Sequence, residues 1–249
     1  MIYYQPTYKD AKFILATTDE PRAIWMVGDK TPTVKPTALL GSIEWTYAIL
    51  DSLGVERPRV IDYQTFPSMR KHFHRKTWRQ LCIDVLDFAT FPVFVKPSGT
   101  LKTWTGRVFE SRRDFNISVE CTKDMMCDCS EPVEFTDEIR TFWRRLELYD
   151  SENRSRGYSA GWNLVAAVGY PQVNEEADYR FAECLGIANG VAEIWPDNDL
   201  PCSTLVIDIG TMNGKQAIVE IGDMFAMGTY GADSEYLRCH KQWCRELFK

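Results

Sequence analysis

The chain has 249 residues, of which 45% are hydrophobic and 26% charged, and a formal net charge of −6. This composition is typical of a folded globular protein and excludes a disordered or fibrous chain, while the acidic balance argues against a generally basic surface for nucleic acid. The sequence lacks the roughly 18 consecutive apolar residues of a transmembrane helix, and Lys9 and Asp10 interrupt any would-be signal peptide. We therefore expect a cytoplasmic protein without a membrane partner.

Residues 1–90 alternate short apolar runs with helical patterns, which indicates a small α/β domain with a mostly parallel sheet. Gly54 follows one of the helices in the position of a C-terminal cap. The expected elements are strands at 12–16, 23–28 and 59–63, and helices at 39–53 and 69–89.

After Pro92 the apolar runs become short and alternating, which is typical of antiparallel strands. The expected strands are 92–97, 106–112, 117–121, 130–135, 138–149, 163–169, 204–210 and 216–222. Helices are expected at 175–189 and from about Ser234, the latter with an apolar stripe that includes His240. We interpret His240 as a core or interface residue.

Three ionisable residues, Lys96, Asp208 and Glu220, interrupt strands that are otherwise apolar. A carboxylate buried without a partner costs several kcal/mol, so each acid needs a cation, a metal or hydrogen bonds. A two-residue turn at Asn213-Gly214 would put the two acids on opposite faces of the hairpin. A three-residue loop with Gly214 in the left-handed conformation would put them on one face.

A third carboxylate, Asp223, has the wrong parity for that face unless a bulge at Gly222 turns it back. Three carboxylates at adjacent strand ends would suit one or two Mg²⁺ ions. The alternative is a pair of strand-end carboxylates that are hydrogen-bonded to nearby loops.

Two further segments have both a functional and a structural interpretation. The loop 98–106 is rich in Ser, Thr and Gly, and its backbone N–H groups and Lys102 could surround a phosphate, although such segments are often hairpin turns. It does not match the P-loop pattern. Arg140 shares a strand face with Glu138, as in a surface ion pair.

The basic segment 70–79 has Phe73 and Trp78 between its charges. Such a segment is either a patch that binds an anionic substrate or the solvated start of a helix, and we favour the solvated helix. The eight cysteines do not have zinc-finger spacing, and we expect them to be reduced.

Taken in order, four segments resemble the ATP-grasp superfamily, and most closely a compact clade, common in bacteria and phages, that is named for one arginine and two lysines. They are ALLGSIEW (38–45), PVFVKPSGTLKTWTGRVF (92–109), SEPVEFTDEIRTFW (130–143) and VIDIG…AIVEIGD…FAMGTYG (206–231).

The resemblance implies an ATP-grasp fold, in which two antiparallel-rich α+β subdomains hold the nucleotide, preceded by a small α/β domain. The implied boundaries are 1–90 for the N-terminal domain and 91–249 for the ATP-grasp domain. Within the latter, the lid would cover about 91–130, the hinge about 130–134 and the metal-binding core about 135–249.

The resemblance also assigns roles to the ATP-binding residues. Lys96 and Lys102 would neutralise the phosphates of ATP, with the loop that contains Thr103 and Gly106 closing over them. The hinge backbone, including Val133, would bind the adenine edge. Glu131 or Glu134 would bind the ribose, and these two alternatives stay open.

The resemblance also implies two catalytic residues. Arg140, together with Lys102, would contact the γ-phosphate or the acyl phosphate formed from it. Asp208, Glu220 and Asp223 would hold Mg²⁺. The chain departs from many ATP-grasp enzymes at Gly222, where an Asn is common.

The implied activity is ATP- and Mg²⁺-dependent ligation of a carboxylate to an amine or another nucleophile through an acyl phosphate. The substrates would be small molecules or peptides, and a nucleic-acid acceptor is less favoured. The alternatives are a phosphotransferase with a hydroxyl acceptor and a nucleotide-binding module without catalysis. GSIEW (41–45) would lie near the acceptor.

Overall fold

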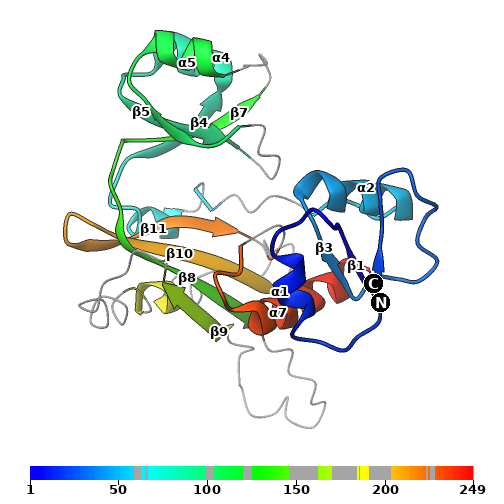
Figure 1. Cartoon of the computed structure of the whole chain (residues 1–249). Helices are drawn as coiled ribbons and strands as arrows, with labels where there is room; N and C mark the ends of the chain where they lie inside the picture. The colour runs from blue at the N-terminus through cyan, green and yellow to red at the C-terminus, as the bar shows by residue number, and fades with distance from the viewer. Residues whose placement is uncertain are drawn as a thin grey trace.

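The structure is a computed structural model of the chain, and the residues that it describes form three separate β-sheets (Figure 1). It describes residues 1–58, 63–64, 67–98, 104–119, 125–145, 162–169, 184, 186–190, 203–222, 224 and 228–248. Most of the expected strand 59–63 and of the expected helix 175–189 lies outside these residues. In the part of the chain that the structure describes, every helix is too short or too polar to cross a membrane.

The N-terminal sheet is parallel, with the order β2-β1-β3. Its elements are β1 (Ile2–Tyr4), α1 (Ala11–Leu15), β2 (Arg22–Ile24), β3 (Ala38–Leu40) and α2 (Ile43–Leu53). The α/β prediction is confirmed, and α2 ends at Gly54, whose φ of 66° is left-handed as a C-terminal cap requires. The strand expected at 12–16 is wrong, because Ala11, Ile14 and Leu15 are buried together at helical spacing.

The small subdomain, residues 77–130, contains an antiparallel sheet of order β4-β7-β5-β6. Its elements are β4 (Thr77–Leu81), α4 (Cys82–Phe88), β5 (Val93–Pro97), β6 (Arg107–Phe109), α5 (Arg112–Ser118) and β7 (Met126–Ser130). An apolar core that includes Val85, Val95 and Phe115 lies between this sheet and its two helices.

Two expectations fail in this region. The helix expected over 69–89 is wrong: α3 (Pro67–Arg70), β4 and α4 replace it, because all five residues of β4 pair with β7. The apolar residues of this segment have helical spacing, but pairing with β7 makes residues 77–81 a strand instead. The strand expected at 117–121 is also wrong where the structure describes it, because residues 117 and 118 close α5, which Ser111 caps. The small subdomain thus begins before residue 91.

The large sheet is antiparallel, with the order β11-β10-β8-β9. Its strands are β8 (Thr136–Arg145), β9 (Trp162–Gly169), β10 (Thr204–Met212) and β11 (Lys215–Gly222). One face, with Phe142 and Val206, packs against the N-terminal sheet and α7 (Asp233–Leu247). The opposite face packs against Met69, Phe73 and Cys184.

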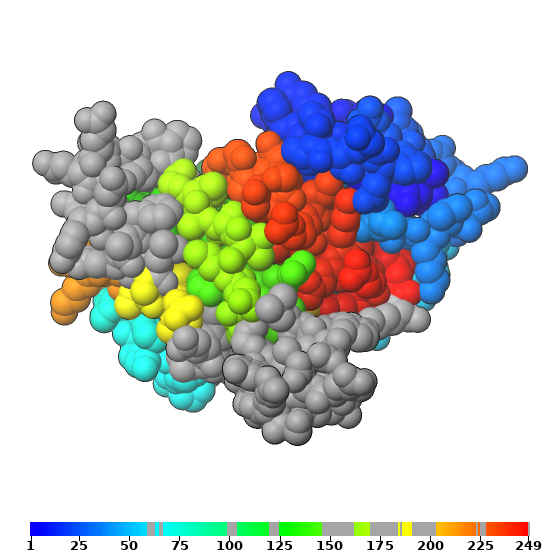
Figure 2. Space-filling model, turned by 90° about the horizontal axis from the view of Figure 1, so that it is seen from below, coloured from blue at the N-terminus to red at the C-terminus, as the bar shows by residue number. Residues whose placement is uncertain are grey.

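The helix α7 joins the large sheet to the N-terminal sheet, and Figure 2 shows its surface directly against the N-terminal residues. The predicted stripe is confirmed, because Tyr236, His240 and Trp243 are all buried. His240 is a core residue, as expected: the Leu39 N–H donates to its Nε2 over 3.1 Å, and its Nδ1 lies 2.8 Å from the Met224 carbonyl. Burial lowers the pKa of His240 to about 4, so the ring is neutral.

The cysteines differ in one respect from the expectation of reduced thiols. Cys82 is in a disulfide whose partner lies outside the described residues. Five other cysteines are buried and are not in disulfides: Cys127, Cys129, Cys184, Cys239 and Cys244. Burial raises the pKa of Cys127 to about 11, which is typical of an unreactive core thiol.

Candidate functional site

The hairpin between β10 and β11 decides where the two predicted acids point. Met212 pairs with Lys215, so Asn213 and Gly214 form a two-residue turn. Both have left-handed φ values, 51° and 73°, as a type I′ turn requires. The three-residue loop is therefore wrong, and this turn alone would place Asp208 and Glu220 on opposite faces.

A β-bulge in β11 reverses that parity. Ile209 pairs with Ile218, but Asp208 pairs with Glu220, so Val219 is an extra residue in β11. A single extra residue moves every later side chain to the other face of the strand. Asp208 and Glu220 consequently lie directly opposite each other on one face, the face of Val206.

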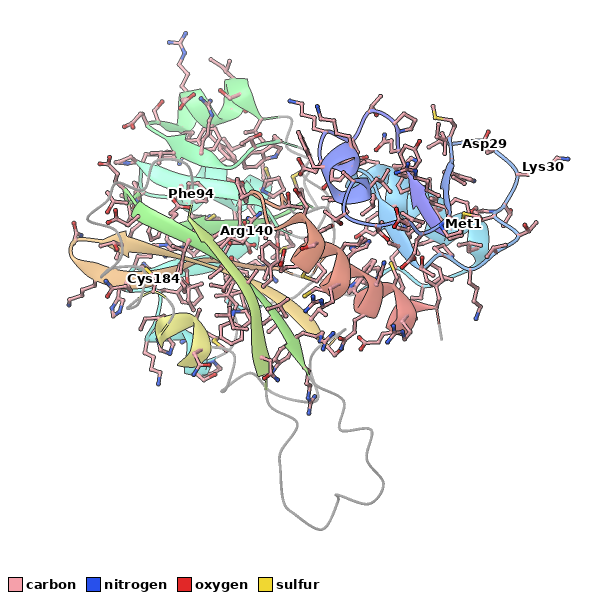
Figure 3. The ribbon with its side chains drawn as sticks, turned by 60° about the horizontal axis from the view of Figure 1, so that its bottom comes forward. Met1, Asp29, Lys30, Phe94, Arg140 and Cys184 are labelled. Carbon is pink, nitrogen blue, oxygen red and sulfur yellow. The ribbon has the colours of Figure 1, made fainter. Side chains whose placement is uncertain are left out.

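Arg140 on the neighbouring strand β8 forms a buried ion pair with Asp208. Its Nε lies 2.9 Å from Asp208 Oδ1 and its Nη2 2.6 Å from Oδ2, while Nη1 donates to the Gly228 carbonyl over 2.9 Å. The Tyr230 ring centroid lies 4.8 Å from the guanidinium carbon. Only 6% of Arg140 and 2% of Asp208 is exposed, so the alternative of a surface pair with Glu138 is wrong. Figure 3 shows Arg140 near the middle of the molecule.

Glu138 belongs to the same electrostatic environment. Burial raises the pKa of its carboxyl, the nearby Asp208 adds to this rise, and Arg140 opposes it. The net effect is a more easily protonated acid beside the Arg140–Asp208 pair.

Lys96 connects the small subdomain to the large sheet. Its Nζ donates to Glu220 Oε1 over 2.9 Å, and the Tyr63 ring centroid lies 6.0 Å away. Burial alone would lower the pKa of Lys96, but Tyr63, Glu220 and Asp128 together raise it above the ordinary value. Lys96 is therefore a charged ammonium held among acidic groups.

The strand pairing extends this row of charges across the small subdomain. Lys96 pairs with Asp128 on β7, and Asp128 pairs with Arg79 on β4. Arg79 Nε lies 2.7 Å from Asp128 Oδ1. Because directly opposite residues share a face of a sheet, all three side chains lie on the face away from the apolar core. From the sequence, Arg79 was considered only as part of the basic segment 70–79, and its pairing with Asp128 was not predicted, because β4 was interpreted as part of a helix.

Gly106 lies against Lys96. A Cβ at residue 106 would come within 2.6 Å of Lys96 Cβ and 3.0 Å of Phe94 Cζ. Such contacts are too short for a side chain, so only glycine allows this close approach to Lys96. Lys102 and Thr103 of the same loop lie outside the described residues.

The segment that was expected to be the hinge passes from β7 to β8. Its Glu131 forms a reciprocal pair with Lys76: the Lys76 N–H donates to Glu131 Oε2 over 3.0 Å, and the Glu131 N–H donates to the Lys76 carbonyl over 3.1 Å. Val133 is partly buried and Glu134 exposed. The two connections between the small subdomain and the large sheet therefore run side by side.

The expected metal ligands are partly visible. Asp208 and Glu220 supply carboxylate oxygens at one place, whereas Asp223 is not among the described residues. In the described ranges, no group of three His, Cys, Asp or Glu side chains is arranged to hold a metal ion. In this conformation Arg140 and Lys96 neutralise the two acids instead.

The N-terminal domain approaches the same place. Burial, and secondarily Asp10, raises the pKa of Tyr8 to about 12, while Arg140 opposes the rise. Burial also raises the pKa of Asp10, and Asp233 at the start of α7 adds to it. Side chains from the loop after β1 and from α7 thus share the electrostatic environment of Arg140.

Comparison with known proteins gives a family and a fold. The family model that matches residues 72–238 describes an ATP-grasp domain, family 2 of the clade named for one arginine and two lysines. No sequence among curated proteins matches the chain.

Several solved structures are similar over most of the chain. An N5-carboxyaminoimidazole synthase from Aspergillus clavatus, in complex with ADP and 5-aminoimidazole ribonucleotide, has a TM-score of 0.53 and 11% identity, covering 96% of this chain and 69% of its own. D-alanine–D-alanine ligase from Bacillus anthracis, complexed with ATP, has a TM-score of 0.50 and 12% identity, covering 98% and 96%. A RimK domain ATP-grasp protein from Sphaerobacter thermophilus has a TM-score of 0.50 and 9% identity, covering 100% and 99%. These similarities confirm the predicted fold.

Proposed function

The chain belongs to this second family of the arginine-and-two-lysine clade of ATP-grasp domains, and from this premise we propose that it joins a carboxylate to an amine or another nucleophile through an acyl phosphate. Family membership confirms the prediction that the chain is an ATP-grasp protein. At the level of the superfamily, this makes it an ATP-dependent ligase. The observation that carries the finer proposal is the convergence of Lys96 and Arg140, from two different sheets, on the carboxylate pair Glu220 and Asp208.

Lys96 is the proposed phosphate ligand of the small subdomain, and Lys102 and Thr103 of the following loop are proposed to complete the contacts. The close approach of Gly106 supports this, because it packs the end of the loop directly against Lys96 Cβ. Arg79 adds a second cation to the same face, at present paired with Asp128. Positive charge around the phosphates stabilises the charge that spreads over the transferred group.

Asp208 and Glu220 are the proposed Mg²⁺ ligands, with Asp223 as a third. Two carboxylates opposite each other on one face fit the oxygen donors that Mg²⁺ prefers. When bound, Mg²⁺ would neutralise phosphate charge at this place. Both acids are now paired with Arg140 and Lys96, so both ion pairs would have to open for Mg-ATP to bind: Lys96 and Arg140 would then hold phosphate oxygens, and the two acids would hold Mg²⁺.

The adenine and ribose are proposed to bind at the hinge, with Val133 contributing backbone groups and Glu131 or Glu134 the ribose contact. The reciprocal bonds between Glu131 and Lys76 favour Glu134, whose exposed side chain is nearer the beginning of β8. Two of the similar structures contain ADP or ATP, which supports a nucleotide in this fold.

In the proposed reaction, a carboxylate oxygen of the substrate attacks the γ-phosphorus, and the bond from that phosphorus to the β,γ-bridging oxygen breaks to release ADP. The nucleophile then attacks the acyl carbon, inorganic phosphate leaves, and the nucleophile loses a proton. Arg140 is proposed to hold the phosphoryl oxygens, and Lys102 to contribute charge to them. The N-terminal loop at Tyr8 and GSIEW (41–45) would face the acceptor, and we propose a cytoplasmic enzyme with small-molecule or peptide substrates.

The decisive experiment is ADP release with Mg-ATP, hydroxylamine and a pool of carboxylic acids. Trapping of a hydroxamate supports the acyl phosphate. A phosphorylated alcohol without hydroxamate would show the phosphotransferase instead. ATP binding without ADP release from any mixture would show a nucleotide-binding module and end the proposal.

A further inference from the structure

We infer that Arg75 is a positioning residue, whose guanidinium fixes the β11 bulge and so holds Glu220 opposite Asp208. The metal-binding role of this carboxylate pair rests on the proposed function. The contacts that hold the bulge are independent of it. Arg75 lies in the basic segment 70–79, where a solvated helix was favoured from the sequence.

The guanidinium bonds to the backbone at the bulge itself. Arg75 Nη1 donates to the Ile218 carbonyl over 2.7 Å, and Nη2 lies 3.4 Å from the Val219 carbonyl. In a regular strand, successive carbonyls point to opposite sides, so one planar guanidinium cannot reach both. The extra residue Val219 turns two successive carbonyls toward Arg75, and the planar fork of Arg is suited to hold them there.

The same segment covers the edge of the large sheet at this point. β11 is an edge strand, and its Ile218 N–H donates to the His72 carbonyl over 2.9 Å. Arg75 also donates to the Phe73 carbonyl over 3.3 Å, and its guanidinium carbon lies 5.0 Å from the Phe135 ring centroid. The contacts on both sides of the guanidinium define its position. A residue that acts by positioning another residue must itself be held in place in this way.

Arg75 also connects the bulge to the hinge. The next residue, Lys76, forms the reciprocal backbone bonds with Glu131. Glu220, one residue after Val219, bonds to Lys96 of the small subdomain. Two consecutive residues, Arg75 and Lys76, thus bond to the bulge and to the hinge, respectively.

The test compares Arg75→Met with Arg70→Met, the same substitution at an exposed arginine of the same basic segment. ATP binding is measured by calorimetry with Mg²⁺ and with EDTA, and hydrogen exchange is measured on peptides that cover 215–222. We expect Arg75→Met to lose about 10- to 100-fold of the Mg²⁺-dependent gain in ATP affinity, the range found when a partner of a metal ligand is removed. Binding in EDTA stays unchanged, exchange at 215–222 becomes faster, and Arg70→Met behaves as wild type.

Deletion of Val219 makes β11 regular and leaves Glu220 opposite Asp208, so in that background Arg75→Met should no longer lower the Mg²⁺-dependent gain. If Arg75→Met keeps either this gain or the wild-type exchange rate at 215–222, the inference is overturned. If Arg75→Met does not fold, Arg75→Lys replaces it, because the Lys ammonium lacks the planar fork that fixes the two carbonyls relative to each other. An unchanged Mg²⁺-dependent gain in that variant would also overturn the inference. If wild type binds no ATP, the proposed function fails, and the exchange rates alone decide whether Arg75 holds the bulge.

Discussion

Lys96 Nζ donates to Glu220 Oε1 over 2.9 Å, although the two residues belong to different sheets and are 124 positions apart in the sequence. Their bond, together with the Arg140–Asp208 pair, means that the cations and the anions of the proposed Mg-ATP site neutralise each other in this conformation. In this conformation each of these four charged side chains thus has a partner of opposite charge within the protein.

Lys96→Ala should abolish Mg-ATP-dependent ADP release while leaving the fold intact. The lost ion pair is partly exposed and contributes about 1 kcal/mol or less to the free energy of unfolding. ADP release and urea unfolding of the same preparation test both statements. Wild-type turnover in this variant would remove Lys96 from the site.

Asp208→Asn should also abolish activity, and at a larger cost in stability. Removal of one partner from a buried ion pair costs about 3–5 kcal/mol, and because Asn keeps one acceptor for Arg140 we expect roughly 2 kcal/mol. Adding Arg140→Met to Asp208→Asn should recover part of that free energy of unfolding without recovering activity. If the double variant is less stable than Asp208→Asn, the unpaired buried charge of Arg140 is not the cause of the lost stability.

Gly106→Ala should weaken ATP binding at least tenfold, because the new methyl group would lie 2.6 Å from Lys96 Cβ and displace that side chain. Steric displacement of this size costs about 1–3 kcal/mol. Gly186→Ala is the matched control, since a Cβ there has no neighbour within 4 Å. Equal ATP affinities in the two variants would show that Gly106 does not position Lys96.

The neutral His240 predicts a pH dependence of stability. Its pKa is about 4 in the folded chain and ordinarily 6.5, so below pH 6.5 the unfolded chain binds a proton that the folded chain does not. The free energy of unfolding should consequently fall from pH 6.5 to pH 4, by about 3 kcal/mol in total from this group. Urea unfolding across this range should show a smaller fall for His240→Gln than for wild type. Parallel pH profiles for the two proteins would contradict this.

The sequence was informative where a charge interrupts an apolar strand. Lys96, Asp208 and Glu220 were identified in this way, because a buried charge must have a partner whatever the fold. The bulge at Val219 could not be predicted, since nothing in AIVEIG (217–222) distinguishes an extra residue from a regular one, and it is the contacts with Arg75 and His72 that hold it.

The pairing of Arg79 with Asp128 was missed for a different reason. Their roles depend on β4 being a strand, and β4 forms because β7, which begins 45 positions after residue 81, is available to pair with it. A local apolar spacing contains no information about that pairing. The ATP-binding, catalytic and metal-binding roles of all the predicted site residues stay predictions, and Lys102, Thr103 and Asp223 also lie outside the described residues.

The bond between the Leu39 N–H and His240 spans 201 positions, and it belongs to a core in which Trp243 and Cys244 cover Ile2 and Leu40. During synthesis, the N-terminal sheet leaves the ribosome long before the helix that completes its core. Until α7 emerges, three short strands present their apolar side chains to water or to a chaperone. The N-terminal sheet thus completes its core only after α7 has been made, and truncation ahead of α7 should yield an aggregating fragment.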